Sequence, residues 1–308
     1  MKRYYRVMLG AKSLYADECY RGNFIGTDFL ADIDLTGKLP EDWRRFNQTF
    51  IPIWMERHPG KSKVAAGLSC GALWTVAKGI KVSDIVLCPN GAGAYYVGEL
   101  LDNYSFHQGE ILPHRRTVKW YPTLIERAAM SESLRNSTGS IGTSSEITKY
   151  AEEIENLIGG KKPVTLISTD ETVEDPSVFA LEKHLEDFLV MNWKQTELGR
   201  DYDIYEEDGE LVGQQYPSDT GPIDILAISK DKKTILVVEL KKGRVSDNVV
   251  GQIQRYMGYV KEELAEDDQR VKGVIIGLSD DLRIRRALSV TNNIEFYRHQ
   301  VSFKLFKS

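Results

Sequence analysis

The chain has 308 residues, enough for two ordinary domains, and 42% of them are hydrophobic and 28% charged. This composition is typical of a soluble globular protein, and no apolar run approaches the roughly 18 to 20 residues of a membrane span. We therefore expect a cytoplasmic protein without a signal peptide. Three widely spaced cysteines, Cys19, Cys70 and Cys88, argue against a disulfide framework and a zinc site. The net charge of −5 neither indicates nor excludes a nucleic-acid binder.

The first 130 residues are rich in short strand-like runs separated by turns. The pattern predicts a strand over 83–88, a turn at 89–91 and a hairpin partner over 94–100. A further strand is predicted over 117–120. Several short strands with glycine turns favour a small β-barrel or a curled sheet.

A polar stretch of small residues over 131–145 predicts a surface connection, and apolar residues at helical spacing predict a helix over 146–158. Glycines and a proline over 159–163 end that helix. We therefore expect a first domain at 1–143, a helical linker at 144–171 and a second domain at 172–308.

The second half alternates between helical and strand-like patterns. Asp175 and Pro176 are typical of a helix start, and the helix is predicted to run over 177–193. The elements expected after it are strands over 221–229 and 234–242 joined by a turn at 230–233, a helix over 248–265, a strand over 271–279, a helix over 279–290 and closing strands over 293–306. This order predicts a mixed α/β domain.

Two carboxylates and an amine fall within the predicted strand pair. Glu239 and Lys241 are two residues apart on one strand, so their side chains share a face, and a hairpin can bring Asp224 beside them. Carboxylates bind Mg²⁺, and a lysine can orient the attacking water or stabilise the phosphate during phosphodiester hydrolysis. The alternative is an ordinary Glu–Lys pair on a solvated edge. The apolar neighbours make both strands look central, where unpaired charges are costly.

These residues belong to a longer pattern that resembles the NucS/EndoMS-like branch of the PD-(D/E)XK nuclease superfamily. The sequence G-P-I-D ends at Asp224, fourteen residues separate it from Glu239, and E-L-K follows over 239–241. The next predicted helix carries Gln252 and Tyr256, similar to the family's Q-x-x-x-Y signature. The resemblance covers about residues 172–308 and implies a restriction-endonuclease-like mixed sheet flanked by helices.

The resemblance implies that Asp224 and Glu239 bind Mg²⁺ or Mn²⁺, with the carbonyl of Leu240 as a third ligand. Lys241 would serve the nucleophilic water.

The preceding helix carries Glu182 in an E-x-x-L pattern with Leu185, and this glutamate would add a carboxylate directly or through water. Glu186 lies one turn further on, so the choice between the two glutamates is open. Gln252 and Tyr256 would orient the site or contact the DNA backbone, with helix packing as the alternative.

The first domain resembles the PUA/EVE-like modules fused to Mrr-type restriction nucleases, which implies a small β-barrel with helices. The matching segments are 23–29, 83–86, 93–100 and 112–120. Ser83 stands where such domains often have glycine, and Gly26-Thr27 stands in place of the usual Gly-Trp.

Such modules hold a flipped base between aromatic faces and read its polar edge, so the resemblance implies recognition of a modified base. The candidate stacking residues are Trp54, Trp74, Tyr95, Tyr96, Tyr104, Phe106 and Trp120. Asp28 could accept a hydrogen bond from the base, while His114, Arg115, Arg116 and Lys119 could hold phosphates. Core packing of each aromatic and a solvated turn for the basic run are the alternatives. The segment Gly60-Lys61-Ser62 lacks the first glycine and the preceding strand of a phosphate-binding loop, so we expect no NTPase.

Together these features predict a modification-dependent restriction endonuclease that recognises a modified cytosine in double-stranded DNA and cuts nearby. One active site cuts one strand, so a double-strand break suggests a homodimer. The alternatives are a repair nuclease acting on mismatched or branched DNA and a catalytically silent DNA-binding protein.

Overall fold

The computed structural model describes residues 2–139, 142–159, 185–207, 209–241, 248–280 and 282–299. The chain divides into two units, Met1–Ile167 and Ser168–Ser308. Within the ranges just given, no helix has the length and apolar character that crossing a membrane requires.

A curled β-sheet forms the centre of the first unit. Its strands are β1 (Tyr4–Val7), β2 (Phe24–Thr27), β3 (Ile85–Pro89), β4 (Ala94–Leu100), β5 (Ser105–Phe106), β6 (His114–Trp120), β7 (Ile125–Glu126) and β8 (Ser144–Glu146). They follow the order β2-β6-β4-β3-β1-β8, with β5 paired to β6 and β7 to β4. The predicted hairpin is confirmed, because β3 and β4 are antiparallel with Leu87 opposite Val97.

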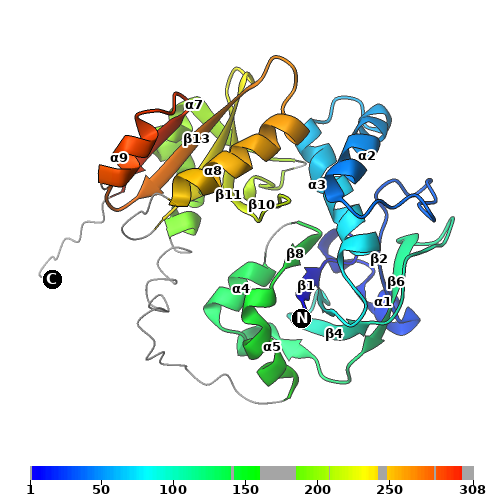
Figure 1. Ribbon diagram of the computed structural model, residues 1–308. Coiled ribbons are helices and arrows are strands. Elements are labelled where there is room, and N and C mark those ends of the chain that lie inside the picture. The colour runs from blue at the N-terminus through cyan, green and yellow to red at the C-terminus, as the bar shows by residue number, and fades with distance from the viewer. Residues whose placement is uncertain are drawn as a thin grey trace, which may run out of the picture. The chain divides into compact units, whose positions relative to one another are not determined.

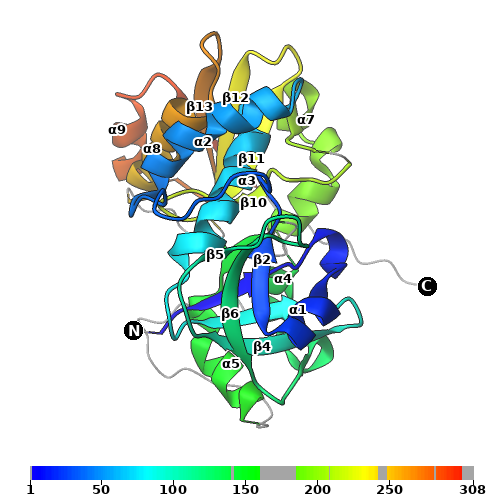
Figure 2. The same ribbon diagram turned by 90° about the vertical axis from the view of Figure 1, so that its right-hand side faces the viewer.

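This sheet is a curled half-barrel, whereas the resemblance implied a small barrel. In the described part of the chain, the edge strands β2 and β8 pair only with β6 and β1 respectively. Figure 2 shows the curl, with β6 turning away from the direction of β4. Both faces of the sheet are buried, one by a cluster that includes Tyr5 and Val86 and the other by one that includes Tyr4 and Ile85. The alternation of side chains along each strand supplies both clusters.

The helices of the first unit that the structure describes are α1 (Ala16–Gly22), α2 (Trp43–Arg57), α3 (Lys63–Trp74), α4 (Glu132–Thr138) and α5 (Ala151–Ile158). Of these helices, only the last was predicted from the sequence, and α4 lies in the stretch predicted as a surface connection. Asp42 caps α2 and Ser62 caps α3 by accepting backbone N–H groups. The Gly-Lys-Ser segment is therefore the start of a helix. Pro52 inside α2 and the glycines of α3 obscured both helices, which bury Phe46 and Leu73 in a shared cluster.

Residues 144–159 belong to the first unit, where the sequence predicted a linker. Strand β8 pairs with β1, with Ser145 opposite Arg6. The helix predicted over 146–158 begins as a short 3₁₀ turn and continues as α5. Ile147 and Ile154 are buried in the same cluster as Tyr4. The core of the first unit therefore extends beyond residue 143.

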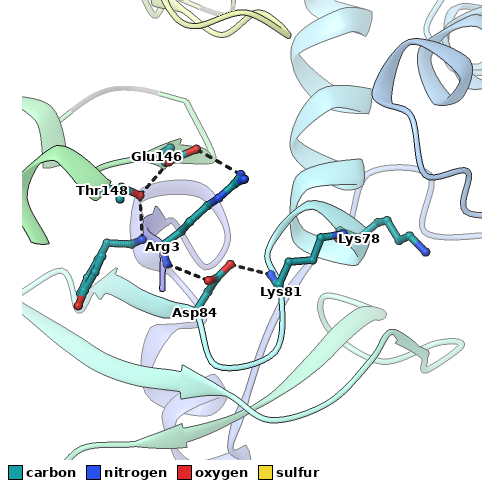
Figure 3. Close-up of polar contacts among 7 residues, drawn as sticks. Arg3, Lys78, Lys81, Asp84, Glu146 and Thr148 are labelled. Atoms are coloured by element: carbon teal, nitrogen blue, oxygen red, sulfur yellow. Dashed lines mark hydrogen bonds and ion pairs between the residues drawn. The ribbon is translucent and has the colours of Figure 1, made fainter. Parts of the chain in front are cut away.

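The turn before β3 is held by a buried carboxylate. Asp84 is 4% exposed and accepts hydrogen bonds from the backbone N–H groups of Arg3 at 2.9 Å and Lys81 at 2.8 Å, as Figure 3 shows. Ser83 before it has a φ of 73°, in the left-handed region that glycine adopts readily. Glycine would suit this backbone better than serine does.

The second unit is a mixed sheet with helices. Its elements are α7 (Leu198–Asp201), β9 (Tyr202–Ile204), β10 (Gln214–Tyr216), β11 (Ile223–Ser229), β12 (Thr234–Leu240), α8 (Asn248–Tyr259), β13 (Arg270–Gly277), α9 (Leu282–Leu288) and β14 (Ile294–Arg298). The strand order is β10-β11-β12-β13-β14, and β9 pairs with β11. Strands β11 and β12 form the predicted antiparallel hairpin, while β12, β13 and β14 run parallel. The predicted mixed α/β pattern is confirmed.

Helix α8 packs on β12 and β13 (Figure 1). Gly273 on β13 permits this close packing, because a Cβ there would lie 2.6 Å from the sulfur of Met257. Residues 185–191 are helical, as predicted. The start of that helix at Asp175 and the last part of the closing strands lie outside the described residues.

Candidate active site

The hairpin of β11 and β12 brings Asp224 to the end of β12. Ile225 lies opposite Val238 in the antiparallel register. One position further along each strand, Asp224 and Glu239 therefore lie opposite each other, at the start of β11 and the end of β12. The backbone N–H of Leu240 donates to Oδ2 of Asp224 at 2.7 Å. Long apolar runs in both strands fix this register, because a shift of one residue would expose the buried side chains.

Glu239 and Lys241 share a face of β12, as their spacing predicts. Nζ of Lys241 lies 2.9 Å from Oε1 of Glu239. Glu239 is 2% exposed, whereas the Lys241 side chain is 34% exposed. The Lys241 ammonium therefore lies between the buried Glu239 carboxylate and solvent, where it can contact an anionic substrate.

The charges around Asp224 favour a cation at this position. Burial raises the pKa of Asp224 well above its usual value, and the carboxylates of Glu239 and Glu186 raise it further. The Leu240 N–H and the Lys241 ammonium lower the same pKa. A divalent cation would offset the repulsion between the carboxylates, so the donor set fits Mg²⁺ or Mn²⁺. Among the described residues, no group of three or more His, Cys, Asp and Glu side chains is already arranged to hold a metal ion.

Glu186 lies at this centre. It is 5% exposed and accepts hydrogen bonds from two glutamines of β10, Gln214 and Gln215, each at 2.7 Å. Glu182, the glutamate expected from the E-x-x-L pattern, lies outside the described residues. Sequence reasoning missed both glutamines, because they lie on a three-residue strand that has no periodic signal.

Gln252 and Tyr256 of α8 lie beside the hairpin. Nε2 of Gln252 donates to the hydroxyl of Tyr256 at 3.3 Å. Tyr256 is 4% exposed, and burial raises its pKa, with further contributions from Glu239 and Asp224. Its hydroxyl would lie 3.2 Å from a Cβ built on Gly221, whose φ is 124°. The Tyr256 side chain is thus buried, and its hydroxyl lies beside Gln252 and Gly221.

The aromatic candidates of the first unit are dispersed over separate clusters. Trp54, Trp74 and Tyr104 belong to the cluster around α2 and α3, and Tyr95 belongs to the one beneath α5. Tyr96 packs on the opposite face with Trp120.

These aromatic residues form hydrogen bonds and ring stacks with other residues of the first unit. The indole N–H of Trp74 donates to the carbonyl of Pro40 at 3.0 Å, and the Trp54 ring stacks on His58 at 3.9 Å. Tyr96 stacks on Tyr20 with a centroid separation of 4.2 Å. A single aromatic pocket built from all the candidates is not present in the described residues.

The basic run at 114–116 is buried. His114 is fully buried, and its ring nitrogens contact the Tyr104 hydroxyl at 2.8 Å and the Leu30 carbonyl at 3.1 Å. Arg116 is 3% exposed and donates to the carbonyls of Asp102, Val76, Ala77 and Ile80.

Arg115 is 9% exposed, lies 3.9 Å above the Phe24 ring and pairs with Glu110 at 2.7 Å. Phe106 packs against the His114 ring with 5.2 Å between centroids. Asp28 and Lys119 are exposed. In this structure Arg115 and Arg116 stabilise the fold. Their expected phosphate contacts stay a prediction.

Comparisons with known proteins separate the chain into the same two parts. Residues 181–301 match the family model described as the Endonuclease NucS C-terminal domain, and residues 5–147 match a domain of unknown function, DUF8426. Endonuclease NucS of Methanocaldococcus jannaschii is 32% identical over 99 residues, which is 32% of this chain and 36% of that protein. The chain thus aligns with about a third of this relative's length.

Two solved structures show distant similarity. A repair endonuclease from Pyrococcus abyssi gives a TM-score of 0.32 at 16% identity, covering 69% of this chain and 66% of the other. A complex of EndoMS with double-stranded DNA gives 0.31 at 12% identity, covering 68% and 62%. The two family models therefore match separate parts of the chain: the first part is similar to DUF8426 and the second to the Endonuclease NucS C-terminal domain.

Proposed function

We propose that this protein is a metal-dependent endonuclease that hydrolyses phosphodiester bonds in double-stranded DNA. The observation that carries the proposal is the grouping of Asp224, Glu239 and Lys241 at the end of one hairpin. The match of residues 181–301 to the NucS C-terminal domain supports it independently.

In this proposal Asp224, Glu239 and the carbonyl of Leu240 would hold the metal. When bound, the metal would supply a nucleophilic water and would neutralise charge on the phosphate. The ammonium of Lys241, 2.9 Å from Glu239, would orient the nucleophilic water or stabilise the phosphate oxygens. Tyr256 and Gln252 fix the wall of the site through their mutual hydrogen bond.

For the substrate, we favour mismatched or branched DNA over DNA that carries a modified cytosine. The C-terminal family match and the M. jannaschii relative both carry the NucS name, which supports the repair-nuclease alternative rather than the restriction enzyme. Support for the modified-base reading is weaker, because its aromatic candidates lie in different clusters and its arginines are bound to main-chain carbonyls. A silent DNA-binding protein would have no use for the buried Glu239 beside Lys241.

Cleavage of a matched panel of labelled duplexes tests this proposal. The panel holds plain, mismatched, branched, methylcytosine, hydroxymethylcytosine and glucosylated-cytosine duplexes of one sequence, with Mg²⁺, Mn²⁺ or EDTA. We expect metal-dependent cutting that is fastest on mismatched or branched duplexes. Faster cutting of one modified duplex would favour the restriction enzyme instead, and no cutting of any duplex would contradict a nuclease.

A further inference from the structure

Two adjacent glutamines of β10, Gln214 and Gln215, hold both oxygens of the Glu186 carboxylate. Nε2 of Gln214 donates to Oε1 and Nε2 of Gln215 donates to Oε2, each at 2.7 Å. Glu186 is 5% exposed, so the amide donors take the place of water around a buried carboxylate. Nε2 of Gln215 also lies 3.1 Å from Oδ1 of Asp224. One amide group therefore links Glu186 to a ligand of the candidate metal site.

The backbone of Gln215 is what allows two neighbouring side chains to reach one carboxylate. On a regular strand, successive side chains point to opposite faces. Gln214 and Tyr216 pair regularly with Ile225 and Ile223, but Gln215 between them has a φ of 51°. A residue with a Cβ pays a conformational penalty in this region, and such conformations cluster at functional sites. The distortion directs both amides to Glu186.

We propose that Gln214 and Gln215 form a glutamine clamp that positions Glu186 as a further carboxylate of the metal site. Gln215 is then a positioning residue that acts through Glu186. The inference rests on the proposed function, because it gives the clamp a role only if the site binds a metal. Groups that orient the residues around a metal typically contribute about 10- to 100-fold to its affinity.

Calorimetry with Mn²⁺ on the full chain separates positioning from a purely conformational role. Gln215→Gly keeps a backbone that accepts a φ of 51° without penalty but removes the amide. We expect Gln215→Gly and Gln215→Ala to bind Mn²⁺ about tenfold more weakly than wild type. The exposed Gln195→Ala is the matched control and should bind normally. Wild-type Mn²⁺ affinity in Gln215→Gly would overturn the clamp.

A double-variant comparison tests whether Gln215 acts through Glu186. If it does, Gln215→Gly combined with Glu186→Gln binds Mn²⁺ no more weakly than Glu186→Gln alone. Additive losses would overturn the inference. In cleavage assays, the clamp variants should need more Mn²⁺ for half-maximal rate while their dependence on DNA concentration stays unchanged. A changed DNA dependence alone would make Gln215 a DNA contact and contradict the clamp.

Two further results complete the test. If circular dichroism shows that the Gln215 variants do not fold, Gln214→Ala makes the same measurement through the other oxygen of Glu186, and normal Mn²⁺ affinity there overturns the clamp. If the wild-type protein neither binds Mn²⁺ nor cuts DNA, the proposed function fails and the inference fails with it. If wild type does both and the clamp variants match it, only the inference fails.

Discussion

Lys241 differs in its expected role from the two carboxylates beside it. Its ammonium has three donors and no lone pair, so it cannot bind a metal while protonated. We expect Lys241→Ala to lose cleavage by roughly 100-fold or more while keeping its affinity for Mn²⁺. Calorimetry and single-turnover cleavage on the same preparation measure both quantities. A loss of Mn²⁺ binding as large as that of Glu239→Gln would show that the lysine organises the ligands instead.

Ser83 carries a conformational cost that a single substitution can remove. Its φ of 73° favours glycine, and its side chain is exposed. We expect Ser83→Gly to raise the free energy of unfolding by about 1 kcal/mol, measured by urea denaturation. Ser83→Ala is the control, because it keeps the Cβ and should give no such gain. Equal stability of the glycine and alanine variants would contradict this explanation.

At the scale of elements, β8 and α5 decide where the first unit ends. Ile147 and Ile154 are buried with Tyr4, and β8 covers the edge of β1. We expect a fragment of residues 1–159 to unfold cooperatively in circular dichroism, and a fragment of residues 1–143 to aggregate or remain unfolded. Equal cooperativity in the two fragments would show that β8 and α5 are dispensable.

The elements that could be predicted from sequence are those with a strong periodic or apolar signal. Strands β11, β12 and β13 have long apolar runs, so the hairpin carrying Asp224 and Glu239 followed from the sequence. Helices α2 and α3 contain proline and glycines that weaken a local helix signal, and their packing on each other stabilises them. The position of Gln215 depends on one unusual φ, which no residue pattern indicates.

At the scale of the whole molecule, a double-strand break needs two active sites. Each chain has one Asp224–Glu239 pair, so we expect two copies related by two-fold symmetry on the DNA when both strands are cut. Analytical ultracentrifugation of the Glu239→Gln variant with a cleavable duplex measures the stoichiometry. A single chain per duplex, together with nicking of only one strand by wild type, would contradict the dimer.

The central claim is that Asp224 and Glu239 hold a catalytic metal, and cleavage by isosteric variants tests it most directly. Asp224→Asn and Glu239→Gln keep the side-chain shapes, and Asp268→Asn changes an exposed carboxylate as the control. We predict that both site variants lose Mg²⁺- or Mn²⁺-dependent cleavage by about 1,000-fold with unchanged circular dichroism, while the control cuts normally. Wild-type cleavage rates in either folded site variant would contradict the account.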